Sequence, residues 1–368
     1  MLNFTSFYLL PLLIQKVGGN EADIGFVSSA GWIASVVGTP LSGVLVDRWG
    51  RKGLLLAGAA LLAAGGLGYL LVHRVGPLMY LLRVLQGVGL AAGLTAGYAL
   101  VADLAPAARR GEAYGIFTVA TLAVHALGPV MGEGFVLAWG FPALFVAAGG
   151  YGAVSLLLGL LVRPPASRPE RAPSSSMWAL LAQRGVWPVL GTMLLLGSSF
   201  GAVLTFVPTY IKSRGHQTVS FFFVTYTGVA VLIRVFLSRL SDRLGRRRVI
   251  LPNLLAMAAV LCVLAWAGSV ALFTVAAFLF GTSQGFLHPA LGALVVDRVR
   301  AGDRGRALGL FSGVFHLGIF LNSVSLGSAA ARFGYPPVYW ISAGMALGCV
   351  AFFARFDPSR EQATPARS

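Results

Sequence analysis

Eleven mostly apolar stretches, each about 20 residues or more in length, follow one another along this 368-residue chain, with short polar loops between them. A helix needs about 20 such residues to cross the hydrocarbon core of a bilayer. Because lipid offers no partners for backbone N–H and C=O groups, a chain with this pattern has to fold as an all-α membrane protein. The stretches run over residues 21–46, 53–73, 77–101, 112–136, 140–162, 186–211, 218–240, 249–268, 271–296, 306–330 and 336–354.

Composition supports the same fold class. Charged residues make up 11% of the chain and apolar residues 57%, whereas a soluble domain has about 25% charged residues. The formal net charge of +16 does not indicate nucleic-acid binding, because the 28 Lys and Arg residues gather mainly in the short loops. That distribution is typical of orientation in a membrane by cytoplasmic positive charge. We therefore expect the lipid bilayer as a partner and no nucleic acid.

The chain begins with a shorter apolar segment, from Met1 to Ile14, which contains Pro11. At 1.5 Å per residue this segment is too short to cross a core of about 30 Å. A signal peptide is the alternative, but the segment has neither a basic beginning nor a small-residue cleavage site. We expect it to be the outer half of a first helix whose beginning is missing.

Residues 163–185 interrupt the apolar pattern with prolines, serines and arginines, a composition typical of a linker. This linker divides the chain into two helical bundles, residues 1–162 and 186–355, and residues 356–368 form a tail. We therefore predict two six-helix bundles, in which eleven helices are complete and the first is partial.

Basic residues are distributed unequally between the two sides of the membrane. When loop 48–52 is placed inside, the loops and tail on its side hold 21 basic residues, and the opposite loops hold five. Cytoplasmic loops of membrane proteins carry such an excess. The linker and the C-terminus are thus expected in the cytoplasm. The preference for Arg over Lys is a hint of a GC-rich bacterial genome. We expect the protein to lie in the bacterial cytoplasmic membrane.

A charged cluster recurs at matching places in the two halves. Asp47-Arg-Trp-Gly-Arg-Lys52 returns 195 residues later as Asp242-Arg-Leu-Gly-Arg-Arg247, and the glycine of each copy permits a tight turn. A second segment, 110–117, matches 304–311 at an offset of 194. Such repeats indicate two halves related by an axis along the membrane normal, with a substrate site near the midplane between them.

Both copies of the cluster resemble the signature loops of the major facilitator superfamily, between helices 2 and 3 and between helices 8 and 9. The resemblance covers essentially the whole chain and implies a secondary transporter with the major facilitator fold. It also implies that the cluster is a cytoplasmic latch, which holds the two halves together on the inner side and favours the outward-open state. The alternative is that the arginines only anchor the topology. The latch residues are Gly43, Asp47, Arg48, Gly50, Arg51, Lys52, Asp242, Arg243, Gly245, Arg246 and Arg247.

The segment Arg83-Val-Leu-Gln-Gly87 resembles the helix 4 motif of this family. Arg83 should lie about 9 Å below the outer surface, where a charged side chain needs a partner or a watery cavity. The resemblance links this Arg to proton coupling. The alternative is an Arg whose side chain extends to the outer interface.

The segment Gly128-Pro-Val-Met-Gly-Glu133 resembles the helix 5 element of the drug/proton antiporter branch, although Val124 and Glu133 stand where that element has Gly. Its bend residues are Gly128, Pro129 and Gly132. Glu133 falls at a depth that can bring it close to Arg83, and a carboxylate beside a fixed cation suits proton coupling. The alternative is an interfacial Glu in contact with water.

Polar side chains near mid-depth are candidates for the substrate cavity. His125 and His316 occupy corresponding places on helices 5 and 11, where imidazole can bind a proton or a polar substrate; the alternative is a buried His bonded to a backbone carbonyl. Arg234 is expected to stabilise the inner end of helix 8, with substrate contact as the alternative. Histidines on separate helices are no ligand set, so we expect no metal site. The cavity candidates are Gln86, His125, His316 and Asn322.

These features predict proton-coupled efflux of a small organic compound by alternating access, with protons and the small-molecule substrate as partners. A nutrient importer of the same fold, a membrane sensor and a truncated fragment are the alternatives. The sequence has no phosphate-binding glycine loop for ATP, and no catalytic constellation stands out. We therefore predict neither an enzyme nor a cofactor, and we expect the protein to act as a monomer.

Overall fold

The computed structural model describes residues 2–106, 109–163, 177–183, 185–237, 244–300 and 303–356. Every secondary-structure element in these ranges is a helix. The elements are α1 (Leu2–Ser6), η1 (Phe7–Leu9), α2 (Leu10–Lys16), α3 (Glu21–Gly68), η2 (Tyr69–Leu71), α4 (Pro77–Leu104), α5 (Arg110–Trp139), α6 (Phe141–Leu161), α7 (Met177–Leu181), α8 (Trp187–Ser213), α9 (Ser220–Phe236), α11 (Arg246–Trp266), α12 (Val270–Val296), α13 (Arg304–Phe333) and α14 (Tyr335–Phe356).

Ten helical segments in the described ranges are long and apolar enough to cross a membrane, and two of them share α3. The eleventh expected span, 218–240, corresponds to α9, which has 17 residues; residues 238–243 after it lie outside the described ranges. Residues 2–16 are helical and shorter than a span. The prediction of an all-α, multi-pass membrane protein is confirmed.

Local chemistry sets where the helices begin and turn. Asn20 precedes α3, and its side chain accepts a hydrogen bond from the Asp23 N–H at 3.1 Å, while the Asp23 carboxylate accepts one from the Asn20 N–H at 2.9 Å. This reciprocal pair is a capping box, which stabilises the start of a helix. Gly50 interrupts α3 with a φ of 74°, and Gly245 precedes α11 with a φ of 87°. Both adopt the left-handed backbone that Gly tolerates, so both copies of the cluster contain the expected turn.

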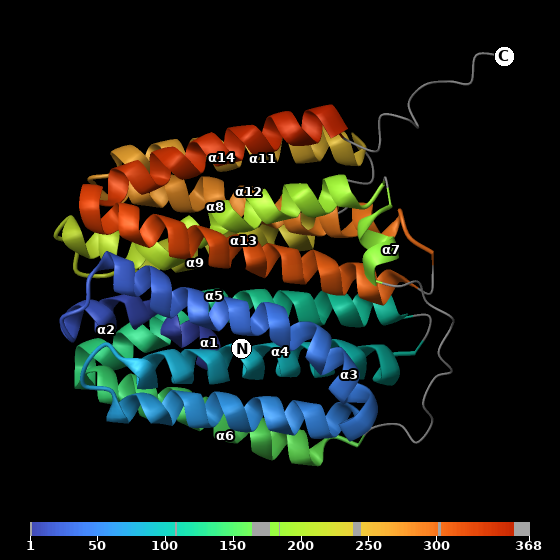
Figure 1. Ribbon diagram of the computed structural model, residues 1–368, viewed down its shortest axis with the longest axis horizontal. Helices are drawn as coiled ribbons and strands as arrows, with labels where there is room; N and C mark the ends of the chain where they lie inside the picture. The colour runs from blue at the N-terminus through green and yellow to red at the C-terminus, as the bar shows by residue number, and fades with distance from the viewer. Residues whose placement is uncertain are drawn as a thin grey trace.

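Figure 1 shows the helices of the first half (blue to green) in its lower part and those of the second half (yellow to red) in its upper part. In the first half α3 packs against α4 and α6; in the second, α8 packs against α13 and α14. The two most extensive contacts between the described parts of the halves, here called seams, are α3 against α13 and α5 against α9. The boundaries of the bundles and the linker stay predictions, because residues 164–176 lie outside the described ranges.

Glycines allow close helix crossings both between and within the halves. A Cβ atom on Gly25 of α3 would overlap with the backbone oxygen of Ser323 and would lie 2.9 Å from the Cα of Gly327, both on α13. Where α8 crosses α13, a Cβ atom on Gly318 would overlap with the backbone oxygen of Leu194. These crossings therefore require glycine, as is common where apolar helices pack in lipid.

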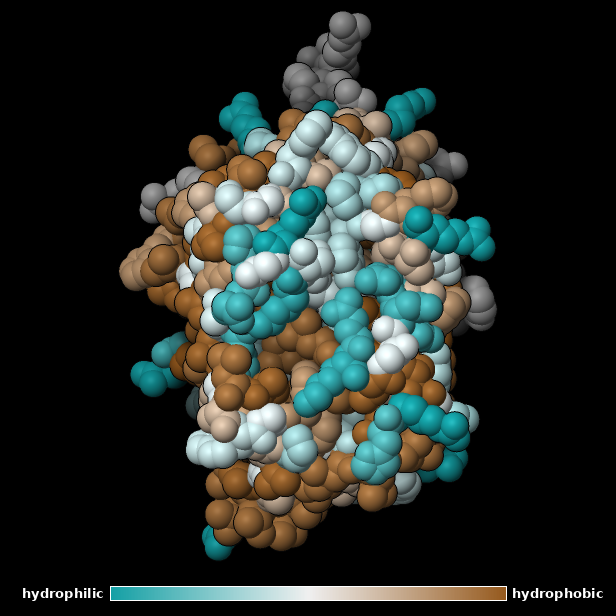
Figure 2. Space-filling view, turned by 90° about the vertical axis from the view of Figure 1, so that its left-hand side faces the viewer, coloured by the Kyte–Doolittle hydropathy of each residue, from teal (hydrophilic) through white to brown (hydrophobic). Residues whose placement is uncertain are grey.

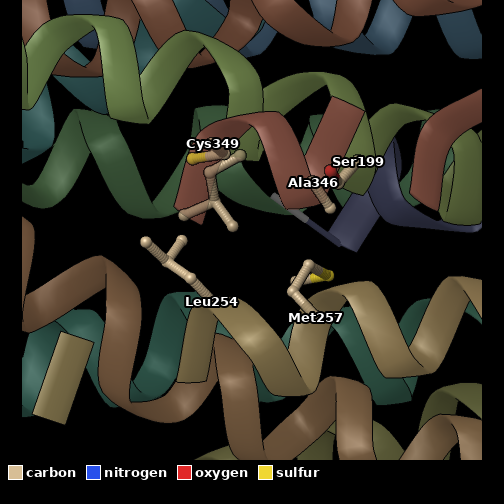
Figure 3. A pocket seen from close by; sticks show the side chains of 6 residues that line it. Ser199, Leu254, Met257, Ala346 and Cys349 are labelled. Carbon is tan, nitrogen blue, oxygen red and sulfur yellow. The ribbon is translucent and has the colours of Figure 1, made fainter. Parts of the chain in front are cut away.

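A narrow gap lies inside the second half, between α8, α11 and α14 (Figure 3). It has no room for a water molecule, and on one side the Cys349 thiol faces the backbone oxygen of Thr192 at 3.6 Å. We take it as a packing gap of the helical core and not as a ligand site. Its lining residues are Leu196, Ser199, Leu254, Met257, Ala346 and Cys349.

Replacement of Gly318 by Ala should lower the stability of the second half by about 1–3 kcal/mol, the usual cost of overpacking, because the new methyl group overlaps with the Leu194 carbonyl. Gly348 on α14 is the matched control, since open space surrounds it and Ala is favoured over Gly in a helix by about 1 kcal/mol. The measurement is the thermal unfolding midpoint of the protein purified in detergent. Equal midpoints for Gly318→Ala and Gly348→Ala would contradict the close crossing.

Candidate functional site

A histidine and two tyrosines meet where α5 faces α9. The Nδ1 atom of His125 lies 3.0 Å from the hydroxyl of Tyr8 and 2.9 Å from the hydroxyl of Tyr226. Tyr8 in η1 and His125 in α5 belong to the first half, whereas Tyr226 in α9 belongs to the second. Both tyrosines are buried, and His125 is partly exposed. His125 therefore bonds to side chains of both halves and not to a backbone carbonyl.

Arg83 is buried in the first half, with 4% of its surface exposed. Its Nη1 donates to Oε1 of Gln86 at 3.0 Å, and its guanidinium lies 5.2 Å from the ring centroid of Phe4. Its positive charge interacts electrostatically with Tyr69 and Tyr8. The alternative of an Arg that extends to the outer interface is therefore wrong: Arg83 is a buried cation that bonds to an amide, and Tyr8 places it beside the His125 cluster.

His316 lies at the other seam, where α13 faces α3. Its Nδ1 atom is 3.4 Å from the hydroxyl of Ser35, and its ring lies 5.3 Å from that of Trp32, centroid to centroid. Asn322, six residues further along α13, instead donates to the Ser342 hydroxyl of α14 at 3.4 Å and is buried within the second half. His316 thus lies between the halves, whereas Asn322 contacts its own half.

Glu133 lies in the seam between α5 and α9, at the end where α9 begins. Its carboxylate accepts hydrogen bonds from the Val219 N–H at 2.8 and 3.1 Å and from the Ser220 N–H at 2.9 Å. These N–H groups mark the start of α9, where free donors and the helix dipole favour negative charge. Glu133 is 5% exposed, so it is not the interfacial, water-facing Glu of the alternative.

The sequence also placed Glu133 close to Arg83, and no hydrogen bond or ion pair of the described residues joins them. Arg83 bonds to Gln86 on its own helix, and Glu133 bonds to the backbone of the opposite half. The expected pair is therefore absent from this conformation. The physical reason is that the bare N–H groups at the start of α9 are the nearer partners for the carboxylate.

A second polar contact joins the halves at the same end of the protein. The Tyr335 hydroxyl of α14 donates to Oε1 of Glu21 at 3.0 Å and accepts from the Gln15 side chain at 3.3 Å. Figure 2 looks onto this end and shows it filled by side chains, many of them hydrophilic. Together with Glu133, this contact holds the two halves against each other at the end opposite Gly50.

The first copy of the charged cluster is attached to its own half. Arg51 forms an ion pair with Asp103 at the end of α4, with 2.5 Å between Nε and Oδ2. Lys52 donates to the backbone oxygen of Leu160 in α6 at 2.6 Å. Gly43 and Arg48 are exposed, and the side chain of Asp47 lies outside the described residues. These contacts hold the loop after the first part of α3 to α4 and α6.

The second copy repeats the arrangement. Arg246 at the start of α11 forms an ion pair with Asp297 at the end of α12, with 2.6 Å between Nη2 and Oδ2. Asp242 and Arg243 lie outside the described residues, and Arg247 is exposed to an intermediate degree. Both described ion pairs join segments of one half, so a latch across the halves stays a prediction.

The helix 5 element contributes packing. Pro129 lies inside α5, and Gly128 beside it is buried. A Cβ atom on Gly132 would lie 3.1 Å from side-chain atoms of Leu9 and Leu144. Gly132 therefore lets α5 approach the short N-terminal helices, which places Tyr8 within reach of His125.

Sequence reasoning missed Tyr8, Tyr226 and Tyr335. Tyr226 and Tyr335 bond polar groups of the other half, and Tyr8 bonds His125 within its own half. A tyrosine in an apolar helix signals a buried hydroxyl that needs a partner, but only the packing shows which partner. No group of three or more His, Cys, Asp or Glu side chains in the described ranges is arranged to hold a metal ion. The described polar residues at the seam between α5 and α9 therefore form a hydrogen-bonded contact between the two halves.

Comparison with known proteins agrees with this architecture. The family model of the Major Facilitator Superfamily matches residues 1–233 and 215–368. The multi-drug resistance efflux pump PmrA of Streptococcus pneumoniae serotype 4 is 24% identical over 374 residues, covering 95% of this chain and 89% of PmrA. The multidrug resistance protein MdtG of Klebsiella pneumoniae is 24% identical over 354 residues, covering 92% of this chain and 85% of MdtG.

A solved structure of a D-xylose-proton symporter shares the fold, with a TM-score of 0.78 and 19% identity, and the similarity covers 99% of this chain and 95% of that one. The two family matches together span both halves and overlap between them. The predicted family and fold are therefore confirmed, and members of this family are transporters and not enzymes. The chain belongs to the Major Facilitator Superfamily.

Proposed function

We propose that this protein exports a small organic compound in exchange for protons, by alternating access of one central site to the two sides of the membrane. The observation that carries the proposal is the cluster of His125, Tyr8 and Tyr226, in which polar side chains of both halves bond at the seam. A site built from two halves changes its access when the halves rock against each other. Export is supported by the relatives named as multidrug efflux proteins.

The described conformation supports access from the inner side. The outer end is held by Glu133 on α9 and by Tyr335 with Glu21. Near the opposite end, a Cβ atom on Gly43 of α3 or on Gly309 of α13 would meet no described residue within 4 Å, so neither glycine makes a close helix crossing. We propose that substrate enters from the inner side in this state. The latch residues then close the inner side while the outer contacts open.

Proton coupling is proposed for Glu133 and Arg83. When α9 leaves Glu133, the carboxylate faces water and can bind a proton. The neutral form rebinds the start of α9 less favourably, because helix N-termini favour negative charge. External protons thus hold the outer side open while substrate leaves. Arg83 keeps a fixed positive charge that interacts with Tyr8, and Tyr8 in turn bonds His125 at the seam between α5 and α9. The charge of Arg83 is thereby connected to the contact between the halves.

The orientation and the assembly state complete the proposal. The excess of basic residues on the side of loop 48–52 supports a cytoplasmic linker and C-terminus, in a bacterial cytoplasmic membrane. Both seams, α3 with α13 and α5 with α9, form within one chain. We therefore propose that a monomer transports.

Transport itself is tested in inverted membrane vesicles with an acidic lumen, using three fluorescent dyes that are cationic, neutral and anionic. At least one dye should accumulate several-fold against its gradient, and the accumulation should collapse when a protonophore removes the pH gradient. Arg83→Gln should abolish this accumulation. Accumulation only in right-side-out vesicles with an acidic exterior would instead indicate a proton-coupled importer, and the absence of flux in either orientation would contradict the transporter proposal.

Replacement of Glu133 by Gln should open the outer seam. A neutral amide loses the attraction of a charge to the start of α9, and charge-assisted hydrogen bonds contribute about 1.5–3 kcal/mol each. The reporter is Thr227→Cys on α9, a buried position, in a chain with Cys262 and Cys349 replaced. Its labelling by an impermeant maleimide from outside should become about tenfold faster.

The matched control for this experiment is Glu112→Gln, which removes an exposed acid near the start of α5. It should leave the labelling rate of Thr227→Cys unchanged. If Glu133→Gln and Glu112→Gln label at the same rate as the parent chain, Glu133 does not close the outer seam.

The latch is tested by Asp47→Asn and Asp242→Asn. Each should slow dye transport several-fold and shift the balance toward the inward-open state, because the loss of a carboxylate removes an ionic contact on the inner side. The measurement combines vesicle transport with maleimide labelling from the inner side at Gly309→Cys. If both transport and labelling are unchanged, the latch is contradicted, and the arginines of the cluster serve only to anchor the topology.

A further inference from the structure

Arg234 on α9 is a partly buried cation without a described partner. Its Nε atom is inaccessible to solvent and makes no hydrogen bond in the described part of the chain. Neither of the described ion pairs involves it. A guanidinium in the interior of a membrane protein is costly unless an anion or a watery cavity compensates it. Something other than the described side chains is therefore needed to balance this charge.

Arg234 interacts electrostatically with side chains on four helices, which come from both halves. Its charge acts on Tyr98 of α4 and on His125 of α5, which belong to the first half. It also acts on His288 of α12 and on Tyr226 of its own helix. Tyr226 and Arg234 are eight residues apart, so they lie on neighbouring parts of one α9 face. Arg234 thus lies on the helix that packs against α5 and contributes Tyr226 to the His125 cluster.

No acid with a described side chain compensates Arg234. Asp103 and Asp297 are taken by Arg51 and Arg246. Glu133 binds the first turn of α9, about 20 Å from Arg234 along the helix. The described side chains with which Arg234 interacts electrostatically are tyrosines and histidines. Tyr98 is 40% exposed and packs edge-on against Phe117, with 4.9 Å between ring centroids, so it offers an accessible ring.

We propose that Arg234 is the group that binds the substrate, and that the substrate is an organic anion that carries a carboxylate or sulfonate next to an aromatic ring. The planar guanidinium presents paired donors that match such an anion. The hydroxyl of Tyr226 and the imidazole of His288 supply further hydrogen-bonding groups, and Tyr98 supplies a ring surface. The inference rests on the proposed transport function, because it names the cargo of that seam.

The position of Arg234 fits loading from the inner side. It lies two residues before Phe236, the last residue of α9, whereas Glu133 closes the first turn of the same helix. A substrate anion on Arg234 would also contact Tyr98 of the first half, so its binding favours a state in which the two halves approach on the inner side. Substrate binding would then promote the closure that alternating access requires.

The test uses three probes with one ring system and different charges: naphthalene-1-sulfonate, naphthalene-1-sulfonamide and trimethyl-(1-naphthyl)ammonium. Their binding to the full-length protein in nanodiscs is measured by fluorescence titration. The parent chain should bind the sulfonate at least about tenfold more tightly than the other two, as a charge-assisted hydrogen bond allows. Equal or weaker binding of the sulfonate would overturn the proposal.

Two variants separate binding from folding. Arg234→Gln should reduce sulfonate affinity about tenfold or more and leave the other probes unchanged, and Arg234→Lys should restore part of it. The matched control is Arg332→Gln, an exposed Arg at the end of α13, which should leave all three affinities unchanged. If Arg234→Gln weakens all three probes alike and lowers the thermal midpoint, Arg234 only stabilises the inner end of α9.

Failure of this inference is distinguishable from failure of the proposed function. Preferential transport of the cationic or neutral dye in inverted vesicles would sustain proton-coupled efflux and overturn the anion site. Charge-selective sulfonate binding that depends on Arg234, without flux in either vesicle orientation, would sustain the site and overturn transport.

Discussion

Polar groups inside a membrane protein depend on partners from the protein itself, because lipid supplies none. Here the backbone is satisfied within helices, and glycines such as Gly25 and Gly318 bring those helices together. Several polar side chains that remain are paired across the two seams. His125 bonds Tyr226, His316 faces Ser35, and Glu133 binds the start of α9. Cohesion between the halves therefore combines close apolar packing with a small number of polar contacts that water can replace.

The two ends of the protein differ in how the halves meet. At the end near Glu133, this buried carboxylate accepts hydrogen bonds from two backbone N–H groups of the other half, and a tyrosine hydroxyl binds Glu21. At the end near Gly50, the described ion pairs stay within each half. In the proposed transport cycle, the closed side needs such contacts between the halves and the open side lacks them. Arg234, near the end of α9, lies toward the end where the described ion pairs stay within each half.

Most of the fold could be predicted from the sequence, because apolar length and basic loops are local properties. The turns at Gly50 and Gly245 also follow from the chain, since a repeated glycine beside charged residues needs a left-handed backbone. The site was less accessible to prediction. Glu133 was paired with Arg83 on depth alone, whereas its partners are backbone N–H groups that no residue type reveals. The roles of Tyr8 and Tyr226 likewise depend on how α5 packs against α9, which is a property of the whole assembly.

The duplicated ion pairs have a mechanical consequence. Arg51 with Asp103 and Arg246 with Asp297 each fasten a connecting loop to a second helix of the same half, at equivalent corners. Each ion pair therefore stiffens its half, because bending at that place would first have to break the ion pair. The contact between the halves instead contains a close glycine crossing of α3 and α13, at Gly25 and Gly327. The two halves are thus stiffened at matching places, by contacts that leave the crossing between them unchanged.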